Sequence, residues 1–410
     1  MVVLNLTSTL GGGSGTCTMQ FHNSLIKNGI DSYTVVYGRY YLGPSGESVP
    51  IRSTRGKLMP RIRRKIFRWM IRKASIDAFY SCYNLSERYN CFSAKDILSS
   101  LPQKPDVVVI HWSSDFVNAK MVSDISRITG AKICYLMLDD AFLTGGCHYP
   151  FTCTQYQVGC ANCPASDSHI VKWAVKKNLQ HKIKHQPDSV CIACSSWDYN
   201  RARLSRIFRD SIIVKHLLYV DETLYKPDVV DFDSLPWNIP KNKKVVLFGA
   251  SSLDEPRKGM RVLIDALQLI RRDDVAFLVV GKCDMDGLPS CAILAGYLDR
   301  DQLIKAYQVA TVFVCPSYED SGPIMINQSI MTGTPVVSYN IGVAQDLVIP
   351  SRTGYLAKSF DSSDLATGIN SILDLTDDQY RSMSNNCREL GLSLFSTIKE
   401  DSWIKRFFLN

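Results

Sequence analysis

Residues 312–337 constrain the fold of this chain more than any other stretch. Val312–Cys315 is an apolar run typical of a buried strand, and a Pro-Ser pair ends it at once. Two acids and a Ser-Gly-Pro turn follow, and then a helical pattern runs through Met331. Pro335 and two valines begin another strand. The order strand, acidic loop, helix, strand indicates an open parallel α/β sheet, in which ligands bind at the carboxyl ends of the strands.

Strand and helix signals alternate through both halves of the 410 residues. This alternation implies parallel sheets covered by helices on both faces, and the chain is too long for one ordinary core. We therefore expect two Rossmann-like α/β domains facing across a cleft. The first would span residues 1–225 and the second residues 244–394, with a proline-rich linker at 226–243. Residues 395–410 would form a helix that crosses back to the first domain.

Composition predicts a globular protein. Charged residues make up 21% of the chain and hydrophobic residues 46%. No run of about eighteen apolar residues occurs, and the N-terminal MVVLNLTSTLGGG lacks a basic leader and a cleavage site. Most of the 14 cysteines lie in apolar, strand-like runs, as Cys134 and Cys315 do, which is typical of reduced thiols. We expect a cytoplasmic protein that is neither exported nor membrane-spanning.

The acidic loop carries residue types that suit a polar ligand. Glu319 and Asp320 come directly before Gly322, and Gln328 lies further along the helix. A single carboxylate near a helix start often serves only as a cap. A binding site is favoured here by the combination of two acids, a nearby amide and a glycine that lets a ligand approach the backbone.

These residues resemble the donor-sugar motif of the family 4 glycosyltransferases, which are retaining enzymes with the GT-B fold. In that family two glutamates separated by seven residues hold the sugar hydroxyls and the nucleotide ribose. The resemblance places Glu319 or Asp320 on the sugar hydroxyls and Gln328 on the ribose, where an amide can still form a hydrogen bond without charge. The other donor contacts that it implies in this loop are Ser321, Gly322, Pro323 and Ile324.

A second loop of the same half offers positive charge. Lys258 lies where a helix begins beyond a buried strand, a place suited to a diphosphate, although a solvated charge is the plainer interpretation. In family 4 a Lys-Gly pair here binds the donor diphosphate, usually with an arginine just after the strand. Ser251 stands at that place, which leaves Lys258 and Arg257 to carry the charge. The resemblance also implies that Tyr297 contacts the nucleotide base, and that no catalytic metal is required.

The first half has two candidate contacts of its own. A glycine-rich turn that includes Gly12 and Gly13 joins a strand to a helix and exposes backbone amides to an anion or a sugar. Asp139 follows a strand at its carboxyl end. Family members commonly have a His-Asp pair there, with the histidine facing the sugar, but this chain has Leu138 at that position. We place Asp139 on the acceptor side and interpret nearby His148 as structural.

An insert at residues 144–164 is rich in cysteine. Four thiolates so close together can close a tetrahedral zinc site. A pair of disulfides and loose thiols packed under a loop are the alternatives. The insert resembles one in polysaccharide-building glycosyltransferases similar to the colanic acid enzymes, which begin it with the same Thr-Gly-Gly-Cys-His-Tyr. We expect a structural zinc ion held by Cys147, Cys153, Cys160 and Cys163.

Residues 52–73 carry ten Lys or Arg residues and no acid, interleaved with apolar residues. Helical spacing puts many apolar residues on one side, which is typical of a helix lying on an anionic bilayer. Nucleic-acid binding and a solvated basic face are the alternatives. We favour the membrane, because similar GT-B enzymes often act on lipid-linked acceptors. The basic residues expected on or beside the opposite face are Arg61, Arg64, Lys65, Arg68 and Arg72.

Together these features predict a retaining glycosyltransferase with a nucleotide-diphosphate sugar as donor. Its acceptor would be a hydroxyl of a lipid-linked oligosaccharide in surface polysaccharide biosynthesis, at the inner face of the cytoplasmic membrane, with no nucleic-acid partner. A nucleotide-sugar epimerase of GT-B shape is one alternative, and it would need no acceptor. A non-catalytic subunit that binds the nucleotide sugar is the other, left open by the departures at Gln328, Leu138 and Ser251.

Overall fold

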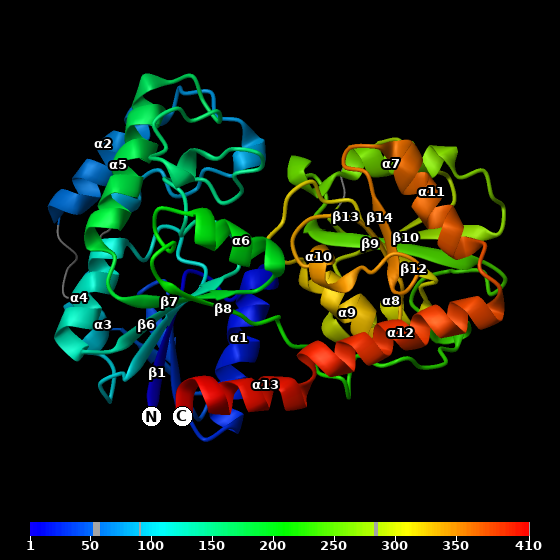
Figure 1. Ribbon diagram of the computed structural model, residues 1–410, viewed down its shortest axis with the longest axis horizontal. Coiled ribbons are helices and arrows are strands. Elements are labelled where there is room, and N and C mark those ends of the chain that lie inside the picture. The colour runs from blue at the N-terminus through cyan, green and yellow to red at the C-terminus, as the bar shows by residue number, and fades with distance from the viewer. Residues whose placement is uncertain (52–57, 90–91, 283–285, 410) are drawn as a thin grey trace. The chain divides into compact units, whose positions relative to one another are not determined.

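The computed structural model describes residues 1–51, 58–89, 92–282 and 286–409 (Figure 1). The chain forms two compact units. The first consists of Met1–Cys194, Asp198–His216 and Asp401–Asn410, and the second of Ser195–Trp197 and Leu217–Glu400.

The first unit is built on a sheet in the order β4-β3-β2-β1-β5-β6-β7-β8. Neighbouring strands from β2 to β8 are parallel, and β3 and β4 add an antiparallel hairpin at one edge. β5 reads Val-Val-Val-Ile and is buried along its whole length, as a central strand covered on both faces must be. The strands are β1 (Val2–Thr7), β2 (Asp31–Val36), β3 (Tyr40–Leu42), β4 (Ser48–Pro50), β5 (Val107–Ile110), β6 (Lys132–Met137), β7 (Ser189–Ala193) and β8 (Ile212–Lys215).

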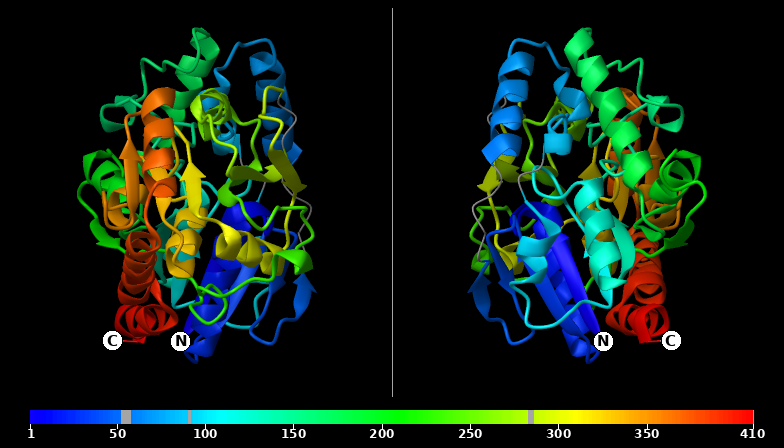
Figure 2. Two further views of the ribbon diagram at one scale, coloured as in Figure 1. Left: turned by 90° about the vertical axis from the view of Figure 1, so that its right-hand side faces the viewer. Right: turned by 90° about the vertical axis from the view of Figure 1, so that its left-hand side faces the viewer.

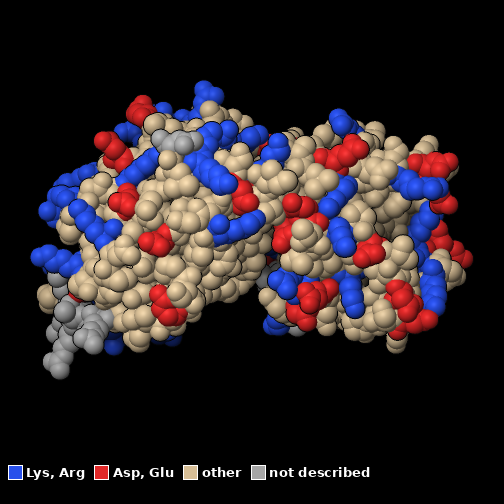
Figure 3. Space-filling model, turned by 90° about the horizontal axis from the view of Figure 1, so that it is seen from below, with Lys and Arg blue, Asp and Glu red and all other residues tan. Residues whose placement is uncertain are grey.

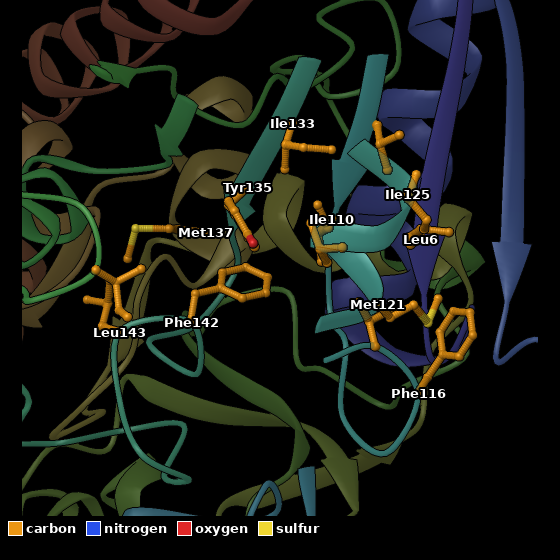
Figure 4. Packing of buried hydrophobic residues seen from close by; sticks show 14 of the residues in the cluster. Leu6, Ile110, Phe116, Met121, Ile125, Ile133, Tyr135, Met137, Phe142 and Leu143 are labelled. Atoms are coloured by element: carbon orange, nitrogen blue, oxygen red, sulfur yellow. The ribbon is translucent and has the colours of Figure 1, made fainter. Parts of the chain in front are cut away.

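Helices cover this sheet and complete its core. Figure 4 shows Leu6, Ile110 and Ile133 of three strands in one cluster with Met121 and Ile125 of α4. α4 begins where the Asn118 side chain accepts the backbone N–H of Met121, and it ends at Gly130 in the left-handed region. The helices are α1 (Gly12–Lys27), α2 (Leu58–Ile71), α3 (Ala94–Leu98), α4 (Ala119–Thr129), α5 (His169–His185) and α6 (Ser196–Leu204).

The second unit has a fully parallel sheet in the order β11-β10-β9-β12-β13-β14. Two hydrophobic clusters lie on its two faces, one with α8 and α9 and the other with α7 and α11. The strands are β9 (Lys244–Ser252), β10 (Val275–Lys282), β11 (Ala292–Gly296), β12 (Val312–Cys315), β13 (Val336–Tyr339) and β14 (Gly354–Ala357). The helices are α7 (Met260–Leu269), α8 (Arg300–Val309), α9 (Ile324–Thr332), α10 (Ala344–Leu347), α11 (Ser362–Leu373) and α12 (Asp377–Phe395). β12, α9 and β13 confirm the strand, loop, helix, strand unit predicted at residues 312–337.

The boundary between the units differs from the prediction. The division falls after His216, and the segment expected to be a linker at 226–243 packs into the second core instead. Leu235, Trp237 and Ile239 from this segment are buried there. Its prolines suggested a linker, but these three apolar side chains anchor it.

The end of the chain belongs to the first unit. After α12 come α13 (Thr397–Ile404) and a short π-helix, Lys405–Leu409. Lys27 of α1 pairs with Asp401 at 2.9 Å, and Trp403 packs against Phe21. The N and C marks accordingly lie near each other in Figure 1 and in both views of Figure 2.

Candidate functional site

Two loops of the second unit meet at the carboxyl edge of its sheet. One follows β9 and ends in a single 3₁₀ turn, Pro256–Lys258, and the other follows β12. The backbone N–H of Tyr318 donates to the carbonyl of Arg257 at 2.7 Å. Gly259 has φ of +72°, and a Cβ built there would lie 1.9 Å from the carbonyl oxygen of Pro316. Only glycine allows so close an approach, so this residue fixes Lys258 beside the acidic loop.

The two loops bring opposite charges together. Lys258 Nζ lies 2.6 Å from Asp320 Oδ2, and Arg257 Nη1 lies 3.0 Å from the same oxygen. Arg257 also pairs with Glu255 at 2.8 Å and donates to the backbone carbonyl of Glu319 at 3.3 Å. Burial alone would raise the pKa of the Asp320 carboxyl, but the positive charges of Lys258 and Arg257 outweigh it and lower that pKa below its usual value. The predicted residues Arg257, Lys258, Glu319 and Asp320 therefore form one cluster.

The amino end of α9 adjoins this cluster. Pro323 precedes the helix and offers no side-chain cap, and the first turn contains no acid. Gly322 and Ile324 are half-buried, so the first backbone N–H groups lie near the surface. The hydroxyl of Ser321 is buried and has no hydrogen-bond partner among the described residues. Unpaired donors at a helix start, next to two cations, are suited to an anion such as a phosphate.

The side-chain amide of Gln328 is hydrogen-bonded within the protein. Its side-chain oxygen accepts a hydrogen bond from the hydroxyl of Tyr307 at 3.1 Å, and its nitrogen donates to the hydroxyl of Tyr225 at 3.1 Å. All three side chains are buried. That Gln328 holds the ribose stays a prediction, and a ribose there would meet an amide that two core tyrosines already orient.

Two further donor contacts are predicted outside these two charged loops. Tyr297 follows β11, and its side chain is 76% exposed, so a ligand could reach it. Ser251 lies near the end of β9, and its side chain falls outside the described part of the structure. Their roles stay predictions.

In the first unit, the glycine-rich turn leads directly into α1. Gly12 is the first helical residue and has φ of +67°, which favours glycine. Gly12 and Gly13 are exposed, Gly11 provides no side-chain cap, and no acid lies in the first turn. The backbone amides here are therefore accessible, as the sequence predicted, and their binding to a sugar or anion stays a prediction.

Asp139 has a partner that the sequence reasoning missed. Its carboxylate lies 2.7 Å from His148 Nδ1 and accepts the backbone N–H of Ala141 at 2.7 Å. The other ring nitrogen of His148 lies 3.0 Å from the hydroxyl of Ser114, and Asp139 and His148 are both buried. The available signal was the insert itself, which returns the chain to the end of β6 nine residues after Asp139. That Asp139 serves the acceptor side stays a prediction.

The insert cysteines gather as the sequence suggested. Cys147, Cys153, Cys160 and Cys163 all line one small cavity of about 20 Å³, and none of them forms a disulfide. No three described His, Cys, Asp or Glu side chains already surround a metal position. The zinc site therefore stays a prediction, supported by the four cysteines that line this cavity.

Comparison with known proteins identifies the second unit most directly. The family model "Glycosyl transferases group 1" matches residues 231–390. A phosphatidyl-myo-inositol mannosyltransferase of Mycobacterium leprae is 28% identical over 183 residues, which cover 42% of this chain and 47% of that protein. One from Mycolicibacterium smegmatis is 33% identical over 166 residues, covering 38% of this chain and 42% of that protein. The chain thus matches less than half the length of these curated relatives.

Solved structures match the whole chain. Sucrose-phosphate synthase from Thermosynechococcus elongatus aligns with a TM-score of 0.69 at 18% identity and covers 100% of this chain and 98% of its own. Anabaena HepE in complex with UDP and glucose aligns with a TM-score of 0.64 at 15% identity and covers 100% and 99%. Identities this low show the fold alone. Residues 231–390 thus match the glycosyl transferases group 1 family, family 4 of the glycosyltransferases, and over its full length the chain has the GT-B fold.

Proposed function

We propose that the protein is a retaining glycosyltransferase that transfers a sugar from a nucleoside-diphosphate donor to a hydroxyl of an acceptor. One observation carries this proposal: Lys258, Arg257 and the open amino end of α9 converge at the carboxyl edge of one parallel sheet. Breaking the bond between a sugar and a diphosphate places negative charge on the departing phosphate. Fixed cations and backbone N–H groups stabilise that charge without reorganising.

Each part of the cluster has a separate task in this proposal. Lys258 and the N–H groups at the start of α9 contact the diphosphate. Arg257, held by Glu255 and the carbonyl of Glu319, fixes the position of Asp320. Asp320 then orients Lys258 and faces the hydroxyls of the transferred sugar. Because the chain itself supplies this positive charge, we propose that no catalytic metal is required.

The relatives support the chemical class of both substrates. HepE was crystallised with UDP and with UDP-glucose, which supports a nucleotide sugar as the donor. The mycobacterial relatives are named as mannosyltransferases acting on phosphatidyl-myo-inositol, which is a lipid. We propose a lipid-linked acceptor for this chain, as in surface polysaccharide biosynthesis, and association with the inner face of the cytoplasmic membrane.

A donor panel tests the proposed function. The purified protein is mixed with UDP-, GDP- and ADP-sugars, and melting temperature and free nucleoside diphosphate are measured with and without membrane lipid extract. We expect one donor to raise the melting temperature, and nucleotide release to increase when acceptor lipid is present. Formation of a new sugar nucleotide without acceptor would instead indicate the epimerase, and binding without turnover would indicate the non-catalytic subunit.

An exposed apolar stripe on α2 supports the proposed membrane contact. Met59, Ile62, Ile66 and Trp69 recur in steps of three and four, so they form one stripe, and all four are exposed, Trp69 by 72%. Phe67, on the opposite face, is buried in the core. α2 lies beside α5 (Figure 1). The exposed basic residues of α2 and the turn after it are Arg61, Arg63, Lys65, Arg68, Arg72 and Lys73.

The charge pattern differs in one respect from the prediction. Arg64 does not face the solvent with the other basic residues: it pairs with Asp115, and its side chain is only 12% exposed. Arg68 contacts the same carboxylate at 2.6 Å. Residues 52–57 lie outside the described part of the chain. We propose that α2 lies on the membrane surface through its exposed apolar stripe. No helix among the described residues could cross a bilayer.

The charge on the face drawn in Figure 3 does not favour nucleic acid. On the face drawn in Figure 3, basic and acidic side chains are interspersed, although the chain carries a net charge of +8. A nucleic-acid groove requires a continuous basic surface, and this face offers none. The stripe of exposed apolar residues on α2 would gain nothing from phosphates but would gain from lipid tails.

Membrane docking can be tested with the double variant Ile66→Asp/Trp69→Asp. Removing two apolar anchors is expected to cost roughly 3 kcal/mol of binding, or about a 100-fold loss in partitioning onto anionic vesicles. Ile398→Asp is the control, because Ile398 is also largely exposed, by 74%, but lies on α13. Sedimentation with vesicles of phosphatidylglycerol and phosphatidylcholine gives the comparison. Equal sedimentation of both variants and the unchanged protein would reject α2 as the docking surface.

A further inference from the structure

The four insert cysteines share features that the proposed transfer reaction does not use. They come from a loop with little regular structure, in which Gln155–Gln157 forms one short 3₁₀ turn. A loop of this length without secondary structure of its own usually needs another source of order. The sulfur-bearing side chains turn to one side and line a single cavity of about 20 Å³, which is closer to the size of one ion or water molecule than to that of a substrate.

Three of these four sulfur atoms also receive a hydrogen bond from a backbone N–H group. The backbone N–H of Gln155 donates to Cys153, and that of Ala165 donates to Cys163, in both cases from two residues further on. Cys160 receives the N–H of Gly145, whereas the hydroxyl of Thr144 donates to the backbone carbonyl of Cys147. Such backbone N–H groups stabilise sulfur that carries negative charge, and they orient it, as the outer partners of metal-bound thiolates do.

A fifth thiol provides an internal comparison. Cys82 lies near Cys147, Cys160 and Cys163. It does not line the cavity of about 20 Å³. Proximity alone therefore does not distinguish the four insert cysteines, whereas lining the shared cavity does.

The loop is held on its inner side by polar contacts to α5. Lys182 donates to the carbonyls of Ala141 and Thr144 at 2.6 and 2.9 Å, and Asn178 donates to the carbonyl of Gly145 at 2.9 Å. These bonds fix where the insert begins. Its outer part, from Cys147 to Cys163, has no such anchor to α5 in the contacts of the described chain, and a cross-link there would order it.

We propose that Cys147, Cys153, Cys160 and Cys163 bind one zinc ion as a closed, tetrahedral, structural site. Four thiolates are a ligand set that zinc prefers, and they leave no position open for substrate. Among the described residues no three potential ligands surround a metal position, so the proposal requires that binding draw the sulfur atoms inwards over the small cavity. Coupling of metal binding to this local ordering is usual for structural zinc.

The site would also position His148, which directly follows Cys147. The backbone N–H of His148 lies 3.2 Å from the carbonyls of Tyr80 and Ser81, and its carbonyl accepts the N–H of Asp140. Its ring contacts Asp139 at 2.7 Å. A zinc ion bound to the neighbouring residue would fix the backbone that carries this ring, so His148 would be ordered by the insert without itself binding metal.

The test is metal content, measured by inductively coupled plasma mass spectrometry on protein purified with reductant and without a metal-affinity column. We expect one zinc per chain and its loss in Cys160→Ser/Cys163→Ser. Cys82→Ser and Cys291→Ser are the matched controls, one beside the cluster and one exposed elsewhere, and both should keep the metal. A strong zinc chelator should lower the melting temperature of the unchanged protein but not that of the double variant.

Several results would overturn this proposal. Zinc-free protein, iron in place of zinc, or equal zinc in all variants would each do so. Mass spectrometry showing two disulfides after alkylation without reduction would favour the alternative cross-link. The measurement does not depend on sugar transfer, so failure of the proposed function and failure of the zinc site can be told apart. Binding of the nucleotide sugar by the second unit should survive chelation.

Discussion

Replacing Lys258 with alanine is expected to lower kcat/KM for the nucleotide-sugar donor by roughly 100-fold to 1000-fold, as removal of a fixed donor from a charge-stabilising site does. Lys258 directly precedes the N-cap residue of α7, its Nζ lies against Asp320, and its side chain is only 15% exposed. A cation at such a partly buried place acts on a diphosphate through less water than a surface lysine does, so its loss is felt strongly as charge develops.

The matched control is Lys305→Ala, an exposed lysine on α8 of the same unit. It removes the same charge from the surface and is expected to leave kcat/KM within about twofold, because surface charges are screened. Arg257 still pairs with Asp320 in Lys258→Ala, so this variant should fold. A folded Lys258→Ala protein that retains its turnover would mean that the leaving diphosphate is stabilised by other groups.

Much of the fold could be predicted because it follows from local pattern. The run Val312–Cys315 and the helix ended by Gly333 determine their own conformations, since buried apolar strands and glycine-terminated helices depend on neighbouring residues. The sequence could also predict, for a related reason, that Asp320 lies close to Arg257 and Lys258. Both loops follow parallel strands of one sheet, β9 and β12, and such loops must lie at the same edge.

The parts that could not be predicted depend on distant residues. The hydrogen bond from the Gln328 amide to the hydroxyl of Tyr225 joins residues about a hundred positions apart, so no local pattern indicates it. His148 looked isolated, because a histidine in an irregular loop carries no periodic signal, yet the insert folds back to Asp139. Leu235 and its apolar neighbours were read as linker because core packing between remote segments leaves no local trace.

Asp320→Asn is expected to lower the free energy of unfolding by roughly 3 kcal/mol, because removing one partner of a buried ion pair leaves uncompensated charge. The side chains of Arg257 and Asp320 are each only 10% exposed, so water cannot replace the lost carboxylate. The pKa of Asp320 is lowered in the folded protein. The stability that ionised Asp320 contributes is therefore present at neutral pH and is lost only as the pH falls through that lowered pKa. The variant and the unchanged protein should accordingly be compared near pH 7.

The control for this variant is Asp301→Asn, whose ion pair with Arg300 is largely exposed and should contribute less than about 1 kcal/mol. Denaturant unfolding gives both values. In Asp320→Asn, Lys258 and Arg257 no longer have the carboxylate of Asp320 as a partner. The phosphates of a nucleoside diphosphate can replace that negative charge, so the ligand should stabilise the variant more than the unchanged protein. If the variant gains no more from UDP, GDP or ADP than the unchanged protein does, these two cations do not receive the diphosphate. The same result would remove the main support for nucleotide-sugar binding at this edge of the sheet.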